Sequence, residues 1–146
     1  MTVYTMGFAQ KNAKKFFDLI KKNSIQLVVD IRLNNKSQLA GFTKGEDLSY
    51  FLKTICNCEY MHRIDFAPTK EILDNYRKGV INWQQYEEKF IPLLRGKESV
   101  KVFLNNIQQY DNICLLCTEP TSEHCHRRLV AEEIARIDES VEIRHI

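Results

Sequence analysis

A chain of 146 residues, 44% of them hydrophobic and 27% charged, has the size and composition of one globular domain and differs from disordered and fibrous sequences. The net charge of +2 gives no argument for strong non-specific attraction to nucleic acid, and none against a local basic pocket. No segment approaches the roughly 20 apolar residues of a membrane span, and the first residues lack the apolar core of a signal peptide. We therefore expect a soluble, cytoplasmic protein with no membrane partner.

Short apolar runs alternate with segments of helical period along the chain. Strands are predicted over 3–5, 26–31, 59–62, 112–118 and 142–146. Between them, apolar residues recur with the i, i+3, i+4, i+7 spacing of a helix that buries one face. These helices are predicted over 13–20, 48–55, 69–78, 83–94, 100–107 and 129–137.

Strands joined by helical crossovers pair in parallel. The predicted fold is therefore a single α/β domain over residues 1–146. It is a three-layer sandwich in which helices flank a mainly parallel sheet of about five strands. Ligands of such sheets bind beyond the carboxyl ends of the strands, so the loops after Met6, Ile31, His62 and Thr118 are the places to search.

The segment from Cys117 to Arg128 carries the densest set of reactive side chains, with thiols, imidazoles, carboxylates and guanidinium groups within twelve residues. Thr121 or Ser122 is the predicted N-cap of the last helix, whose first N–H groups favour an anion. Arg127 nearby adds a guanidinium group suited to phosphate or carboxylate.

A second polar group of residues follows the second strand, where Asp30 and Arg32 leave an apolar run. The loop after them is long for a compact domain, and long loops often carry function. Its side chains Asn34, Ser37 and Gln38 are all of types that can donate or accept hydrogen bonds, which suits a polar, neutral part of a ligand such as a base or a sugar.

The cysteines allow several interpretations. The chain has five of them, an odd number that is poorly suited to a disulfide framework, so free thiols are expected. Cys117 and Cys125 with His124 or His126 form one possible zinc site, yet seven residues separate the thiols and neighbours on a helix diverge by about 100°. We therefore assign no metal ligands and keep a metal or redox protein as an alternative. A further interpretation of the cysteines is that Cys125 is a reactive thiolate at a helix N-terminus.

Three motifs together give the chain a family resemblance. They are Leu27-Val28-Val29-Asp30-Ile31-Arg32, Leu116-Cys117-Thr118-Glu119 and Cys125-His126-Arg127-Arg128-Leu129. With these motifs, the sequence resembles the domain of unknown function 488 family. The resemblance implies a small α/β domain in which the Asp-x-Arg strand end and the Cys-x-Glu…Cys-His-Arg loop meet, and it implies no particular reaction or cofactor. Many members have Gly-His-Ser after the first strand, where this chain has Gly7-Phe8-Ala9.

The favoured hypothesis is an enzyme or enzyme-like domain that binds a phosphate-bearing or other anionic ligand, with nucleotides and nucleic acids as the favoured candidates. The expected catalytic residues are Asp30, Glu119, Cys125 and His126. The expected ligand-binding residues are Arg32, Asn34, Ser37, Gln38, Cys117 and Arg127.

Two alternatives compete with this hypothesis besides the metal or redox protein. A non-catalytic nucleic-acid-binding module predicts one continuous basic surface that includes Lys11, Lys14, Lys15, Arg127 and Arg128. A structural alternative makes the polar residues a buried ion-pair network that ties the loops together, formed by Asp30, Arg32, Glu119 and Arg127.

Overall fold

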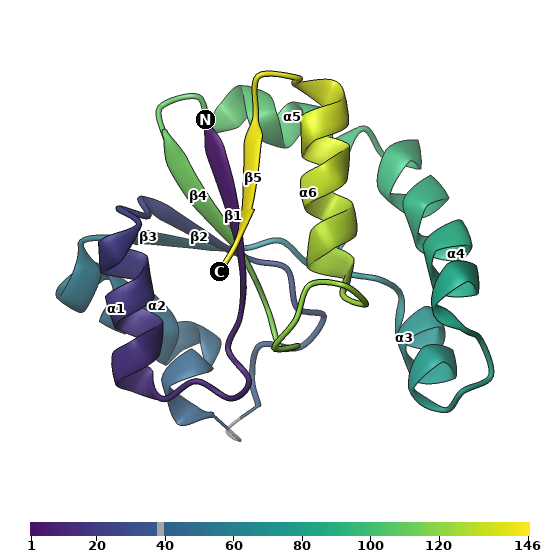
Figure 1. Ribbon diagram of the computed structural model, residues 1–146, viewed down its shortest axis with the longest axis horizontal. Coiled ribbons are helices and arrows are strands. Elements are labelled where there is room, and N and C mark those ends of the chain that lie inside the picture. The colour runs from purple at the N-terminus through teal and green to yellow at the C-terminus, as the bar shows by residue number, and fades with distance from the viewer. Residues whose placement is uncertain (38–39) are drawn as a thin grey trace.

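A parallel β-sheet runs through the centre of the molecule, with helices on both of its faces (Figure 1). The computed structural model describes residues 1–37 and 40–146. The sheet has the strand order β3-β2-β4-β1-β5, and all its pairings are parallel. Its strands are β1 (Thr2–Gly7), β2 (Leu27–Asp30), β3 (Glu59–His62), β4 (Asn112–Cys117) and β5 (Glu142–His145).

The helices lie in the intervals between successive strands. The α-helices are α1 (Ala13–Lys22), α2 (Gly45–Cys56), α3 (Lys70–Arg77), α4 (Trp83–Gly96), α5 (Ser99–Asn106) and α6 (His126–Ile137), and two short 3₁₀ turns cover Gly41–Thr43 and Ile64–Phe66. Within residues 1–37 and 40–146, no helix combines the length and the apolar character that a transmembrane span requires.

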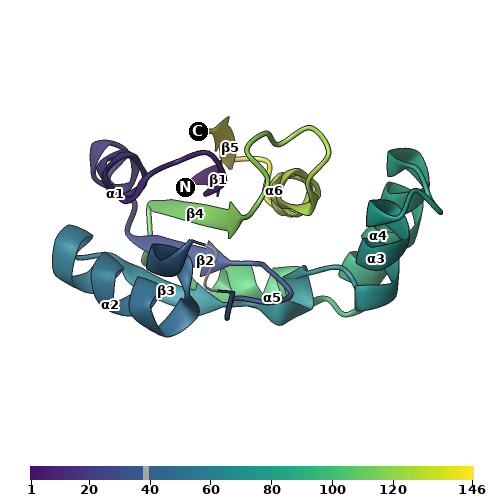
Figure 2. The same ribbon diagram turned by 90° about the horizontal axis from the view of Figure 1, so that it is seen from below.

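Each face of the sheet has its own hydrophobic core. On one face, α1 and α2 pack Phe16 and Leu52 against Val28. On the other face, the core formed by α3 to α6 includes Phe103 of α5 and Val130 of α6. The view from below in Figure 2 shows α3 and α4 at one end of the molecule, beyond α6. This arrangement confirms the predicted three-layer α/β sandwich.

The carboxyl ends of β2 and β4 lie side by side, because these strands pair directly in the middle of the sheet. The chain leaves β2 toward α2 on one face, and it leaves β4 toward α6 on the opposite face. Neighbouring strand ends whose connections diverge in this way leave a crevice between them, which is the usual ligand site of open α/β sheets.

The start of α4 is fixed by a reciprocal pair of hydrogen bonds. The Asn82 side chain accepts a hydrogen bond from the Gln85 backbone N–H, and the Gln85 side chain accepts one from the Asn82 N–H. This capping box satisfies two donors at the helix start and makes Trp83 the first helical residue. The aromatic side chains of the first turn of α4 therefore have a defined position near the strand ends.

The start of the last helix differs from the prediction. Neither Thr121 nor Ser122 caps it; the N-cap is Cys125, whose backbone is extended (φ −134°, ψ 139°), and α6 begins at His126. The Cys125 side chain makes no capping hydrogen bond. The loop from Thr118 to His124 thus lacks helical structure, and its start is tied to the loop after β1 by the hydrogen bond from the Ala9 N–H to the Thr118 carbonyl oxygen.

Candidate functional site

The strand ends of β2 and β4 border a cavity of about 450 Å³, a volume within the usual range of ligand sites. His126 and Ile31, 95 positions apart in the chain, are in hydrogen-bond contact there. The expected meeting of the two motifs is therefore present in the structure. The cavity is lined by Arg32, Leu33, Asn34, Lys70, Leu73, Asp74, Tyr76, Arg77, Trp83, Tyr86, Cys117, Thr118, Glu119, His124, Cys125 and His126.

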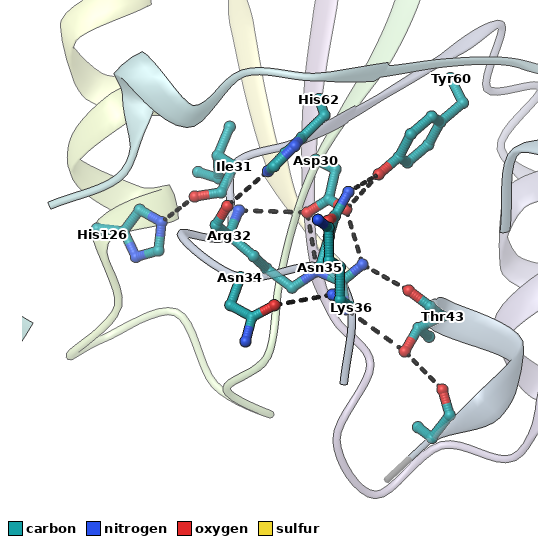
Figure 3. Close-up of polar contacts among 11 residues, drawn as sticks. Asp30, Ile31, Arg32, Asn34, Asn35, Lys36, Thr43, Tyr60, His62 and His126 are labelled. Carbon is teal, nitrogen blue, oxygen red and sulfur yellow. Dashed lines mark hydrogen bonds and ion pairs between the residues drawn. The ribbon is translucent and has the colours of Figure 1, made fainter. Parts of the chain in front are cut away.

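Asp30 and Arg32 form a buried ion pair beside the cavity (Figure 3). The Asp30 carboxylate accepts hydrogen bonds from Nε and Nη2 of Arg32 at 2.8 and 2.7 Å, from the Arg32 backbone N–H, and from the Tyr60 hydroxyl at 2.6 Å. Burial, together with the neighbouring Asp30 charge, raises the pKa of Tyr60. Each oxygen of Asp30 accepts two hydrogen bonds, and the side chain is completely buried. The carboxylate therefore holds Arg32 and Tyr60 in place and does not line the cavity.

The Arg32 guanidinium connects this ion pair to the loop that precedes α2. Its Nη2 also donates to the Thr43 backbone carbonyl at 2.6 Å, and Nη1 lies 3.4 Å from the Thr43 hydroxyl. Phe8 lies over the guanidinium, 5.1 Å from its central carbon to the ring centroid. All three nitrogen atoms of Arg32 thus have partners within the protein, although the side chain forms part of the cavity wall.

The loop after β2 contributes one of its predicted polar residues to the cavity. Asn34 lines the wall, and its side-chain oxygen accepts the Lys36 backbone N–H in a local turn. Asn35 lies behind it and donates to the Tyr60 hydroxyl at 3.0 Å. Ser37 is exposed and outside the lining set, while Gln38 lies outside the described residues, so the roles predicted for both stay predictions.

Two imidazoles hold the backbone turn that follows β2. Nε2 of His126 lies 2.7 Å from the Ile31 carbonyl oxygen, and Nε2 of His62 lies 2.8 Å from the Arg32 carbonyl oxygen (Figure 3). A carbonyl oxygen only accepts hydrogen bonds, so each Nε2 carries the proton and donates it. The Nδ1 atom of a neutral His126 ring is consequently left with a free lone pair.

Two thiols lie beside the His126 ring rather than along that lone pair, since the Cys117 sulfur is also 3.9 Å from Nε2. The Cys117 sulfur lies 3.6 Å from Nδ1 of His126, and the ligand atoms of Cys117, Cys125 and His126 all lie within 4.8 Å of one another. All three side chains are buried and still contribute to the cavity wall. We call these three residues the CCH cluster. The expectation that Cys125 and His126 diverge assumed that both are helical, whereas the extended backbone of Cys125 turns its thiol toward the imidazole.

The pKa values of the two thiols in the CCH cluster shift in opposite directions. A hydrogen bond from the Cys125 thiol, assisted by the backbone N–H groups of Thr118 and Glu119 and by the Arg127 charge, lowers the pKa of Cys117. The same sulfur–sulfur contact and burial raise the pKa of Cys125. Cys117 therefore holds negative charge more readily than its partner, which reverses the sequence-based hypothesis of a Cys125 thiolate.

Arg127 takes a different position from the one expected of a ligand-binding residue. Its side chain is only 1% exposed; Nη1 donates to the Glu119 carbonyl oxygen at 2.6 Å, and Nε lies 3.4 Å from the Thr5 hydroxyl. It does not line the cavity. Arg127 instead fixes the backbone of the loop after β4, and the Glu119 side chain is exposed at the cavity edge. The structural alternative is thus correct for the pair of Asp30 with Arg32, whereas Arg127 binds a carbonyl rather than a carboxylate.

One wall of the cavity is aromatic and comes from helices that follow β3. Trp83 stacks on Tyr86 and on His124, with centroid distances of 4.6 and 5.2 Å, and Tyr76 of α3 contacts both α4 rings edge-on. Sequence reasoning predicted α3 and α4 but did not assign these side chains to the site. The sequence signal is the aromatic pair at 83 and 86, three residues apart and hence on one helical face.

Two basic residues of α3 complete the cavity wall. Lys70, Asp74 and Arg77 lie at positions i, i+4 and i+7, so they share one face of the helix, and all three line the cavity. Across the chain as described, neither Lys70 nor Arg77 has an ion-pair partner. Sequence reasoning missed these two as well.

The comparisons with known proteins identify a family and no individual relative. A family model described as a domain of unknown function, DUF488, matches residues 12–134, a range that includes both the Asp30 strand end and the CCH cluster. Neither the curated proteins nor the solved structures contain a significant match. Because the family model covers well over half of its length, the chain belongs to the DUF488 family.

Proposed function

We propose that the cavity is an enzyme-like site for an anionic small molecule, with nucleotides and other phosphate-bearing compounds as the leading class. The observation that carries the proposal is the pair of cations on α3. Lys70 and Arg77 line a concave site, and neither has an ion-pair partner among the described residues. Asp74 and Glu119 line the same cavity, so its overall charge is not strongly positive; the two cations of α3 favour an anion locally, through charge-assisted hydrogen bonds.

The aromatic wall supports a ligand with a planar part. Tyr76 and Trp83, which are both partly exposed, line the same cavity as the two cations, whereas Tyr86 is buried and stacks behind Trp83. Stacking of a base on an aromatic ring is tolerant of base identity and contributes about 1–3 kcal/mol. A nucleotide meets both requirements, since it combines a planar ring with a phosphate.

In this proposal Lys70 and Arg77 of α3 bind the anion, in place of Arg32 and Arg127. The guanidinium nitrogen atoms of Arg32 are hydrogen-bonded to Asp30 and Thr43, and Arg127 is buried against the loop after β4. Glu119, exposed at the cavity edge, is then the predicted carboxylate best placed to exchange protons with a ligand. Cys125 and His126 also line the cavity, but Cys117 is the thiol whose pKa is lowered, so Cys117 replaces Cys125 as the proposed nucleophile.

Observations on the basic residues favour a small ligand over a nucleic-acid-binding surface. The surface required by that alternative includes Arg127, which is buried, and Arg128, which is paired with Glu87 and Glu132. Lys14 is paired with Asp18. A continuous row of free cations is therefore missing at these residues.

Calorimetric titration with a panel of nucleoside mono-, di- and triphosphates and inorganic phosphate tests the proposal. We expect Lys70→Ala and Arg77→Ala each to weaken binding of the best ligand about tenfold, which corresponds to about 1.4 kcal/mol. Lys78→Ala is the matched control, because Lys78 adjoins the same helix, is exposed and lies outside the cavity. Equal affinities for all four proteins, or no binding of any panel member, would refute the anion site.

A further inference from the structure

We propose that Cys117, Cys125 and His126 bind a zinc-type divalent metal ion, with one coordination position open to the cavity. The inference does not depend on the identity of the anionic ligand. It begins with the spacing of the ligand atoms, since Sγ of Cys117 and Nδ1 of His126 are 3.6 Å apart. In a tetrahedral zinc site with ordinary Zn–S and Zn–N bond lengths, a sulfur and a nitrogen ligand are also about 3.6 Å apart.

The local backbone brings all three ligand atoms to one point. Cys117 ends β4, Cys125 is the extended N-cap residue, and His126 is the first residue of α6. Their ligand atoms all lie within 4.8 Å of one another. Two of the ligands thus come from adjacent positions, which a continuous helix would direct apart by about 100°.

The imidazole already has the tautomer of a metal ligand. Its Nε2–H donates to the Ile31 carbonyl oxygen at 2.7 Å, and this bond fixes the tautomer in which Nδ1 has the lone pair that a metal needs. The Cys117 sulfur lies beside the ring, 3.6 Å from Nδ1 and 3.9 Å from Nε2, so metal binding requires the ring and the thiol to reorient slightly. Metal-bound histidines almost always donate their second ring N–H to such a partner. The edge of the ring also contacts Phe90, at a centroid distance of 6.0 Å and an interplanar angle of 85°, which further limits its rotation.

The chemistry of the donors selects the class of metal. Two thiolates and one imidazole are soft and intermediate ligands that suit Zn²⁺ and disfavour Mg²⁺ or Ca²⁺. Two thiolates also neutralise a divalent charge, which matters because the three side chains are buried. A simple dithiol–disulfide pair of Cys117 and Cys125 would not require a buried imidazole beside the two sulfurs.

The position of the CCH cluster makes this a reactive type of site rather than a purely structural one. Structural zinc sites have four protein ligands, whereas catalytic sites have three and leave a position for water or substrate. Among the residues that the structure describes, the cluster has three members, and all of them line the cavity. A metal ion bound there would offer its free position to an oxygen of the cavity ligand or to water, with Glu119 in the same cavity wall.

Titration of the reduced, chelator-treated protein with Co²⁺ alone tests the inference. Cobalt bound tetrahedrally by thiolates gives sulfur-to-cobalt charge-transfer bands and strong d–d bands, which surface carboxylates do not produce. We expect these bands to saturate at one equivalent of Co²⁺ and to disappear when one equivalent of Zn²⁺ is added. A fully reduced wild-type protein that develops no charge-transfer band would overturn the inference, and this result needs no variant.

Variants assign the bands to the CCH cluster. Cys125→Ala and His126→Gln should weaken Co²⁺ binding by at least the roughly 10- to 100-fold that loss of an outer-sphere partner causes. Cys114→Ala is the matched control, because Cys114 is a buried thiol on the same strand that lies outside the cluster. Bands that survive in Cys125→Ala and His126→Gln would place the metal elsewhere and overturn the assignment. The titration contains no organic ligand, so its failure would leave the anion site standing, and failure of the nucleotide panel would leave the metal site standing.

Discussion

Nε2 of His126 donates a hydrogen bond of 2.7 Å to the carbonyl oxygen of Ile31, and this bond joins the start of α6 to the end of β2. The bond has a neighbour one residue later, where His62 at the end of β3 donates to the Arg32 carbonyl at 2.8 Å. The turn after β2 is therefore held from both sides.

The His62 bond can be tested apart from the cavity, because His62 does not line it. His62→Phe leaves the Arg32 carbonyl without this donor and should lower the free energy of unfolding by about 0.5–1.5 kcal/mol. Urea denaturation measures the loss. Co²⁺ binding by the CCH cluster should persist in this variant, since His126 keeps its own bond to Ile31. An unchanged unfolding curve would show that the turn does not need this bond.

Gly7 is required by its contact with the loop after β4. A Cβ atom at this position would lie 1.5 Å from the Glu119 carbonyl oxygen, which is main chain and cannot rotate away. Gly7→Ala should therefore destabilise the protein by at least about 2–3 kcal/mol and displace the loop that Arg127 holds. Thermal unfolding measures the effect.

Gly96→Ala provides the comparison for Gly7→Ala, because no atom lies within 4 Å of the added Cβ at the end of α4. That helical substitution should be neutral or stabilising, by up to about 1 kcal/mol. Similar unfolding temperatures for the two variants would contradict the steric argument at Gly7.

The ion pair of Asp30 and Arg32 is expected to be structural. Asp30→Asn leaves the Arg32 guanidinium buried without its counter-charge, so it should cost about 3–5 kcal/mol. Asp18→Asn removes an exposed i, i+4 pair with Lys14 and should not change stability measurably. Guanidinium denaturation of both variants makes the comparison. A fully stable Asp30→Asn protein that had lost ligand binding would instead assign Asp30 to the chemistry.

Glu133 predicts a pH dependence of stability. Its side chain is 4% exposed, and hydrogen bonds from Arg136 and Arg95 hold its pKa below the ordinary value of 4.5. A lowered carboxyl pKa adds stability that is complete above pH 4.5 and disappears as the pH falls through the folded-state pKa. Glu133→Gln should therefore lose about 1–2 kcal/mol at neutral pH, and the difference from wild type should shrink in acid. A difference that stays constant with pH would exclude this ionisation as the cause.

The fold was largely predictable because its signals are local. The run Leu27 to Asp30 is apolar enough to be a strand covered on both faces, and it is buried throughout. Helical stripes such as Phe16, Phe17 and Ile20 also became buried faces. The adjacency of the β2 and β4 ends followed from parallel pairing.

The site was predicted less completely because its details depend on packing between distant segments. Spacing alone placed Cys125 and His126 on one continuous helix, and only the actual helix start makes their ligand atoms converge. Nothing in the sequence around Arg127 distinguishes a buried guanidinium group from one that binds a ligand. The positions of Lys70 and Trp83 in the cavity wall depend on how α3 and α4 pack near the strand ends, which helical periodicity does not specify.

Trp83 offers the most direct test of the proposed site, because it is the single tryptophan of the chain and lines the cavity. Its indole Nε1–H is buried and has no hydrogen-bond partner within the described residues, so its one cross-peak in a ¹H–¹⁵N spectrum reports on cavity occupation. Titration with adenosine monophosphate, and separately with inorganic phosphate, is followed at this cross-peak. We expect a saturable shift with at least the nucleotide, and in Arg77→Ala we expect the same shift at about tenfold higher nucleotide concentration. A cross-peak that stays fixed while other resonances saturate would place the ligand outside the cavity and contradict the proposed site.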